Sequence, residues 1–197
     1  MEPQPFAPVK NNPYGDEVTE ISNPVYNNNM PGDQLTHLDT HGNARMVDVS
    51  QKPVSVRSAV AKGEVVLKPD TLFKIKQKLL KKGDVLTVAQ IAGVMAAKRT
   101  AEWIPLCHPI PLEDIQVQVE LSITLPGVII TAEVRTTGKT GVEMEALTAV
   151  SAAALTIYDM VKAVEKPCIQ NIHLVEKHGG TGGDYVEETT HVENEET

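Results

Sequence analysis

Two runs of alternating apolar and polar residues constrain the fold more than any other part of the sequence. In residues 115–123, "IQVQVELSI", every second residue is apolar, and the alternation returns over residues 128–134, "VIITAEV". A period of two places neighbouring side chains on opposite faces of a strand, so each run predicts a strand with one buried face. The four residues between them, "TLPG", are a turn. The runs therefore predict a β-hairpin packed on a core.

Helical patterns lie on both sides of this hairpin. Asp70 is expected to cap the N-terminus of a helix that ends at Gly83. The apolar residues of this helix recur at helical spacing: Leu72, Ile75 and Leu79. A second helix is predicted over residues 84–100, with Val88, Ile91, Ala92 and Met95 on one stripe. A long helix is predicted over residues 141–164.

Two further strands complete the pattern. Residues 63–68, "GEVVLK", precede the helices, and residues 169–175, "IQNIHLV", follow the long helix. The resulting order is strand, two helices, two strands, helix, strand. This order is typical of an α+β fold, a ferredoxin-like split βαβ sandwich in which an antiparallel sheet carries its helices on one face.

The two ends of the chain are predicted to be tails around a single domain at residues 35–185. Residues 1–34 are crowded with Pro and Asn and show no period, which predicts a flexible segment. Residues 186–197 form an acidic tail. Residues 1–33 carry a net charge of −4 and residues 184–197 carry −6, so the total of −8 leaves about +2 on the middle of the chain. That balance suits a small anionic ligand better than duplex nucleic acid.

Composition also bears on location. No apolar run approaches membrane-spanning length, and the N-terminus lacks the basic start and apolar core of a secretory signal, so no membrane partner is expected. Two cysteines do not make a disulfide framework. A cytoplasmic protein is the simplest expectation.

The segment "WIPLCHPIP", residues 103–111, is stiffened by its prolines. Proline fixes φ and pushes the preceding residue out of the α region, so Cys107 and His108 are expected in an extended, rigid loop. A metal site is disfavoured, because two adjacent residues do not make the usual spaced ligand set. His108 alone is more often a hydrogen-bonded loop residue than a base.

Other charged residues have equally plain explanations when taken separately. Lys82 before Gly83 can favour the dipole at a helix C-terminus, and Glu143 and Glu145 the dipole at a helix N-terminus. Asp159 and Lys162, three apart on a helix, can be a surface ion pair.

The long helix adds a geometric constraint. Glu145 and Asp159 are fourteen residues apart, which in an α-helix leaves them about 40° from alignment and roughly 21 Å apart along the axis. They share a face but cannot contact the same atom. If both serve one small ligand, either that ligand is long or the two ends come from different copies of the chain.

Several motifs in order carry a family resemblance across about residues 35–185: "KKGDVLTVAQIAGVMAAKRT", "IPLCHP", "TGKTGVEMEALTAVSAAALTIYDMVKAV" and "HLVEKHGG". Together they resemble the cyclic pyranopterin monophosphate synthase family of early molybdenum cofactor biosynthesis. The resemblance implies a ferredoxin-like subunit in a homohexamer, a trimer of dimers with active sites at the dimer interface. It also implies a lyase that converts 3′,8-cyclo-7,8-dihydroguanosine 5′-triphosphate into cyclic pyranopterin monophosphate and pyrophosphate. The resemblance implies no redox cofactor and assigns no metal-ligating residue.

The resemblance assigns roles to individual residues. The catalytic candidates are Asp159, Lys162 and Lys82; a lysine whose pKa is lowered by a nearby cation or a dry pocket can shuttle protons, with Asp159 holding it in place. The substrate-binding candidates are Leu106, Cys107, His108, Met144, Glu145, Glu143, Arg57 and Lys177. One of the two glutamates would accept hydrogen bonds from the guanine-like base, while Arg57 and Lys177 would bind phosphates.

One departure from the family motif and three competing functions accompany this interpretation. Relatives often have "GGKSG" after the lysine, whereas this chain has "GGTGG", so Thr181 stands where a lysine would. A ferredoxin-like sheet can instead be an RNA- or nucleotide-binding module, but the hairpin strands carry no aromatic residue for base stacking. A nucleotide-hydrolysing metalloenzyme and an inactive scaffold of the same fold are also compatible with the sequence.

Overall fold

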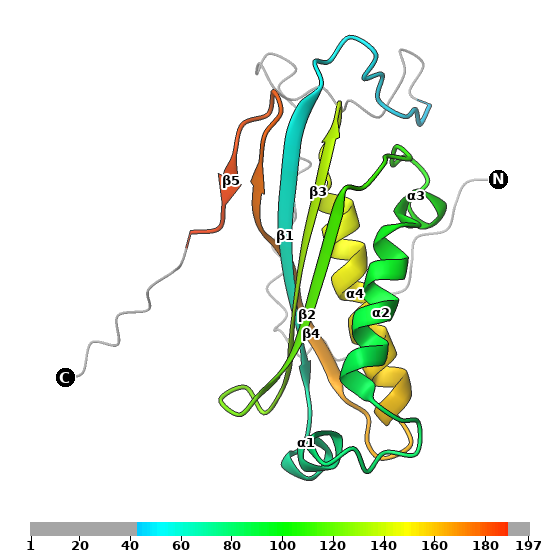
Figure 1. Cartoon of the computed structure of the whole chain (residues 1–197), viewed down its shortest axis with the longest axis vertical. Helices are drawn as coiled ribbons and strands as arrows, with labels where there is room; N and C mark the ends of the chain where they lie inside the picture. Colours follow the sequence, from blue (N-terminus) through cyan, green and yellow to red (C-terminus); the bar gives the residue numbers. More distant parts are fainter. Residues whose placement is uncertain (1–42, 189–197) are drawn as a thin grey trace, which may run out of the picture. The chain divides into compact units, whose positions relative to one another are not determined.

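The computed structural model describes residues 43–188, and its centre is a five-stranded antiparallel sheet (Figure 1). The strand order is β2-β3-β1-β4-β5. The proposed tail at residues 1–34 and residues 189–197 of the acidic tail lie outside the described residues, so the domain boundaries stay predictions.

The elements follow the predicted order, with a short helix and a fifth strand added. They are β1 (Ser55–Val66), α1 (Pro69–Lys76), α2 (Val85–Ala97), α3 (Thr100–Trp103), β2 (Asp114–Ser122), β3 (Gly127–Gly138), α4 (Glu143–Val161), β4 (Cys168–His178) and β5 (Tyr185–Val186). Because β3 lies between β1 and β2 and is antiparallel to both, the first four strands have the split βαβ arrangement. The predicted fold class is confirmed.

The predicted hairpin is present as β2 and β3. Their register runs from Asp114 opposite Arg135 to Ser122 opposite Gly127. The alternation has the expected effect, since the core-facing residues of β3 are fully buried: Val128, Ile130, Ala132 and Val134. A Cβ on Gly127 would collide with the backbone carbonyl of Val65, so glycine allows β1 to approach at this turn.

The helices α2 and α4 cover one face of the sheet (Figure 1). Alanine is the commonest residue on the buried side of α4. Gly93 of α2 faces this helix, and a Cβ atom added to it would lie only 3.0 Å from the carbonyl oxygen of Ala149. Such small residues let the two helices pack closely. Within residues 43–188, α4 is the one helix long and apolar enough to cross a membrane, contrary to the sequence-based expectation. Most of it is buried, as in the core helix of a globular domain.

The predictions for β1 and α1 were partly wrong. β1 begins at Ser55, eight residues before the predicted start, because it pairs with β3 along its whole length. Its inward positions there hold Arg57, Ala59 and Ala61, which make a weak apolar pattern. α1 ends at Lys76 rather than near Gly83, and its N-cap residue is Lys68, not Asp70.

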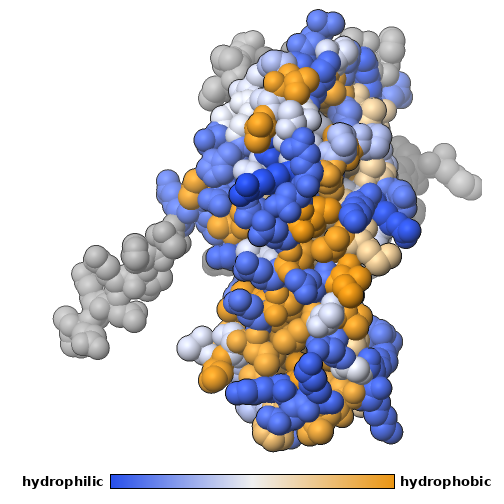
Figure 2. Space-filling model, viewed as in Figure 1, coloured by the Kyte–Doolittle hydropathy of each residue, from blue (hydrophilic) through white to orange (hydrophobic). Residues whose placement is uncertain are grey.

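The apolar stripe predicted on α2 faces outward. Val88, Ile91 and Met95 are exposed, whereas the buried residues of this helix are Val85, Ala89, Gly93, Ala96 and Ala97. Trp103 and Leu155 add to the exposed apolar residues of the helical layer. Figure 2 shows hydrophobic residues among hydrophilic ones on the surface of the molecule. Exposed apolar surface of this kind is typical of a contact face.

Candidate active site

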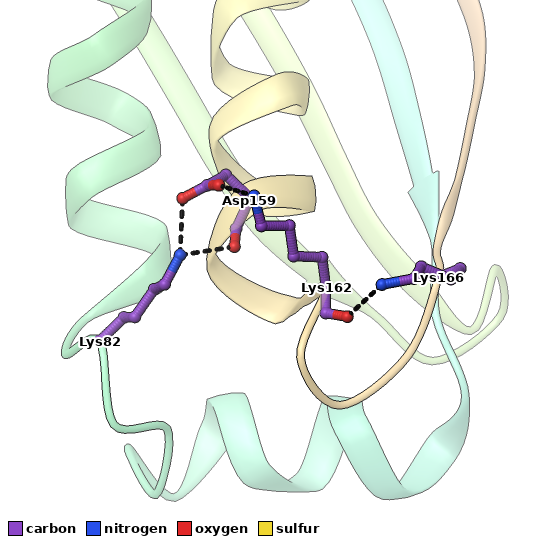
Figure 3. Close-up of polar contacts among 4 residues, drawn as sticks. All are labelled: Lys82, Asp159, Lys162 and Lys166. Atoms are coloured by element: carbon purple, nitrogen blue, oxygen red, sulfur yellow. Dashed lines mark hydrogen bonds and ion pairs between the residues drawn. The ribbon is translucent and has the colours of Figure 1, made fainter.

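Three charged side chains meet at the C-terminal end of α4: two belong to that end of the helix, and the third comes from a loop far away in the sequence (Figure 3). The Lys82 Nζ atom lies 2.7 Å from Oδ2 of Asp159 and donates a second hydrogen bond, of 2.8 Å, to the Asp159 backbone oxygen. The Lys162 Nζ atom lies 2.7 Å from Oδ1 of the same carboxylate. Asp159 therefore bridges two ammonium groups, and all three predicted catalytic residues are brought together.

Electrostatics fix the protonation of this cluster. Hydrogen bonds from Lys162 and Lys82 lower the pKa of Asp159 to about 2, so its carboxylate is ionised at neutral pH. The same contact raises the pKa of Lys162. This direction is opposite to the lowered lysine pKa considered from the sequence. Each of the three side chains is about half exposed, which leaves the cluster open to a ligand.

Local structure places Lys82 in the loop between α1 and α2. Gly83 follows it with φ +91°, a conformation that favours glycine. Asp84 then caps α2 by accepting from the Thr87 backbone N–H at 3.2 Å, and it pairs with Lys78 at 2.9 Å. The start of α2 at this position was predicted, and the cap holds the loop next to the end of α4.

The "LCHP" loop lies near the opposite end of α4. His108 Nε2 is 2.8 Å from the Val47 backbone oxygen. His108 and Glu145 both line a cavity of about 310 Å³ with the basic residues Lys98 and Arg99. Leu106 and Cys107 adjoin it in sequence and are half-buried.

Glu145, at the N-terminal end of α4, is a buried acid with a raised pKa. It is 4% exposed, and burial raises its pKa to about 7, with the charge of Glu143 adding to the shift. Burial and the nearby Glu145 charge also raise the pKa of Cys107, which keeps that thiol protonated. Met144, between the two glutamates, is exposed.

Glu143 has a different partner from Glu145. Its Oε1 atom lies 3.4 Å from Nζ of Lys177 on β4. The two glutamates, equivalent in the sequence pattern, thus face different surroundings: one lines the cavity with His108, and the other pairs with a lysine.

Arg57 of β1 is buried with an unsatisfied guanidinium group. It is 7% exposed, its Nε atom donates to the Gly138 carbonyl at 3.1 Å, and its buried Nη2 has no hydrogen-bond partner among the described residues. Its Nη1 packs against Gly180, where a Cβ would not fit. An arginine donor left free beside a glycine-rich loop is suited to an anion. Thr181, in that loop, is exposed.

The site residues therefore form two groups on one protomer. Asp159, Lys82 and Lys162 lie at the C-terminal end of α4, whereas the "LCHP" residues, Glu143 and Glu145 lie at its N-terminal end. The helical rise places Glu145 and Asp159 roughly 21 Å apart along the axis.

Sequence reasoning gave no role to Arg99. This residue lines the cavity that contains Glu145 and also a groove of about 510 Å³ between α2 and α4 that Asp159 lines. The motif "AAKRT" was part of the family resemblance, but two basic residues after a helix are explained equally well by the helix dipole. Within residues 43–188, no group of three His, Cys, Asp or Glu side chains is placed to hold a metal ion.

These features define an α+β domain with an exposed cluster of two lysines and a carboxylate at one end of α4 and a buried carboxylate beside a basic cavity at the other. The family model described as "MoaC family" matches residues 46–180 of this chain. Cyclic pyranopterin monophosphate synthases from Methylobacterium sp. (strain 4-46) and Brevibacillus brevis are each 57% identical, over 77% and 78% of this chain and 95% and 96% of their own length. That of Thermomicrobium roseum is 55% identical over 77% of this chain and 92% of its own length.

The chain belongs to the MoaC family. The resemblance drawn from its motifs is confirmed, as are the enzyme class and the place in molybdenum cofactor biosynthesis that the resemblance implied.

Proposed function

We propose that this protein converts 3′,8-cyclo-7,8-dihydroguanosine 5′-triphosphate into cyclic pyranopterin monophosphate, with release of pyrophosphate. The observation that carries the proposal is the cluster in which Lys82 and Lys162 both contact Asp159. The reaction opens and recloses rings by proton transfers, and a substrate hydroxyl displaces pyrophosphate to form the cyclic phosphate. Both tasks need proton donors and acceptors next to cationic groups.

In this proposal Asp159 is the acceptor and the two lysines are the donors. An ionised carboxylate can take a proton from a substrate hydroxyl or ring N–H, and Lys162, whose pKa is raised, is a protonated donor for the group that departs. Lys82 adds a second positive charge that stabilises developing negative charge on the phosphate oxygens. Substrate binding would exchange part of the internal pairing for contacts to the substrate.

The opposite end of α4 is suited to the guanine-derived base. Glu145 in its ionised form can accept two N–H hydrogen bonds from the base, and His108 lines the same cavity. Leu106, Cys107 and Met144 would form its edge. Glu143 is less suited to this role, because Lys177 already pairs with it.

Arg57 and Lys177 are proposed to bind the phosphates. The Arg57 Nη2 donor is buried and unpaired, and Lys177 Nζ lies near Gly182 in the glycine-rich loop. Backbone N–H groups of that loop can supply further donors, which offsets the absence of a lysine at Thr181.

The separation along α4 supports a site built from two copies of the chain, within a homohexamer of three dimers. One copy would supply the Asp159 cluster and the other the Glu145 cavity with Arg57. The exposed apolar side chains of α2, α3 and α4 are suited to such a contact. A cytoplasmic location is proposed with it, supported by two free cysteines among the described residues.

The test supplies purified protein with the cyclised dihydro-GTP and follows pyrophosphate together with the cyclic pterin. Wild type should form both in equal amounts, whereas Lys82→Ala and Asp159→Asn should lose turnover. Lys81→Ala is the matched control, because it removes the neighbouring exposed lysine and should keep activity. Folded wild type that makes no product would contradict the proposed function.

A further inference from the structure

Glu165 is a buried carboxylate that the proposed reaction does not use. It is 9% exposed and lies four residues beyond the end of α4. Both of its oxygens accept from the backbone N–H of Lys68, at 3.0 Å through Oε1 and 3.2 Å through Oε2. Burying a carboxylate without hydrogen-bond partners would cost free energy, and the Lys68 N–H supplies the partner here.

The contact between Glu165 and Lys68 caps the N-terminus of α1. Lys68 is the N-cap residue of that helix, and its side chain makes no capping hydrogen bond. In a capping box, a glutamate at the third helical position reaches back to the N-cap N–H. Here that position is Thr71, and Glu165, 97 residues away in sequence, makes the equivalent bond. The start of α1 is thereby attached to the end of α4.

This attachment joins two elements that adjoin the catalytic cluster. Asp159 and Lys162 belong to the end of α4, only a few residues before Glu165. Lys82 lies in the loop that follows α1 and, as Figure 3 shows, reaches Asp159 from that loop. The adjacent Lys166 donates to the Lys162 backbone oxygen at 2.6 Å, which closes the end of α4 itself.

We propose that Glu165 is a positioning residue for Lys82: by holding the first turn of α1 against the end of α4, it sets the place of the Lys82 ammonium group beside the Asp159 carboxylate. The inference rests on the proposed function for its catalytic meaning. The geometric link between Glu165, α1 and Lys82 can be measured without any turnover.

The first experiment titrates the Asp159 carboxyl group by ¹³C NMR in substrate-free protein. Glu165→Leu removes the acceptor from the Lys68 N–H, so α1 should shift, Lys82 should leave Asp159, and the Asp159 pKa should rise from about 2 toward its value in Lys82→Ala. Glu165→Gln keeps a carbonyl acceptor and should keep the wild-type titration. Lys68→Pro removes the donor instead, at a residue whose φ of −69° suits proline, and should act like Glu165→Leu.

Val134→Ala is the matched control for destabilisation, since it opens the core at a fully buried residue of β3 away from α1. It should lower Tm and leave the Asp159 titration unchanged. If Glu165→Leu and Lys68→Pro behave in the same way as this control, Glu165 serves only stability and the proposal is overturned.

Kinetics give the second measurement. Glu165→Leu should lower kcat about tenfold to a hundredfold, as expected when a catalytic group is displaced, while KM changes little. Glu165→Gln should recover most of the loss. If the Asp159 pKa rises in Glu165→Leu but even wild type shows no turnover, the positioning role is supported and the proposed function is rejected. Failure of the positioning role and failure of the proposed function are therefore distinguishable.

Discussion

Glu145 is the residue whose ionisation is most altered by the fold. In the unfolded chain its carboxyl group titrates near 4.5, whereas burial in the first turn of α4 raises its pKa to about 7. The folded protein therefore binds a proton more tightly than the unfolded chain between these two pH values. By linkage, stability falls as pH rises through this window and is level above it.

Replacing Glu145 with glutamine should remove this pH dependence. The difference in unfolding free energy between wild type and Glu145→Gln should change by about 3 kcal/mol between pH 4 and pH 8, with the variant favoured at the higher pH. Urea unfolding at several pH values measures it. Glu102→Gln, an exposed carboxylate beside the same cavity, should follow wild type. A constant difference across the range for Glu145→Gln would contradict the raised pKa.

The pH profile of turnover should separate the two acids of the site. If ionised Glu145 accepts hydrogen bonds from the base, kcat/KM in wild type falls below an apparent pKa of about 7. Asp159, with a pKa of about 2, contributes nothing in that range. Glu145→Gln should show a lower kcat/KM without the acidic limb. An acidic limb of the same midpoint in this variant would assign the titration to another group.

At the scale of single elements, the N-terminus of α2 governs the loop that carries Lys82. Asp84→Ala removes the capping bond to Thr87 and the ion pair with Lys78, so it should destabilise the protein by about 1 kcal/mol. Asp84→Asn keeps a capping oxygen and loses only the exposed ion pair, so it should remain close to wild type. Thermal unfolding measures both variants. Equal losses would show that the ion pair, not the cap, carries the effect.

The same elements show how far the sequence could predict the fold. The hairpin was predictable because each strand buries one face, and the alternation in residues 115–121 and 128–134 matches the burial in the structure. The alternation fails at its last residue, because Ile123 lies beyond the end of β2 and is exposed. The start of β1 was not, because its core positions hold alanine and a buried arginine rather than large apolar residues. The N-terminus of α1 was predicted at Asp70 instead of Lys68, because the acceptor for the Lys68 backbone N–H is the carboxylate of Glu165, which lies far along the chain.

The candidate site was predictable in composition but not in arrangement. Motifs pointed to Asp159, Lys162 and Lys82, yet the two hydrogen bonds from Lys82 depend on tertiary packing of the α1–α2 loop against α4. The same applies to the glutamates: no local pattern distinguishes Glu143, which pairs with Lys177, from Glu145, which lines the cavity.

For the domain as a whole, the length of α4 decides how a complete site can form. One substrate would have to span roughly 21 Å to contact both Glu145 and Asp159 of the same helix. An isologous contact between two copies can instead bring the Asp159 end of one helix next to the Glu145 end of the other, twice per dimer. Exposed apolar residues on this helical layer, among them Ile91 and Leu155, are suited to that contact.

A site shared between two copies predicts that two inactive variants restore each other. In a mixed dimer of Asp159→Asn and Arg57→Ala, one of the two sites combines both substitutions and is inactive, while the other combines two intact halves. After the variants are unfolded and refolded together, random pairing should return about a quarter of wild-type turnover. Asp159→Asn mixed with Lys82→Ala is the control: both changes fall in the same half, so neither mixed site is intact and activity should stay absent. Recovery in the control, or none in the first mixture although mixed dimers have formed, would place the whole site within a single protomer.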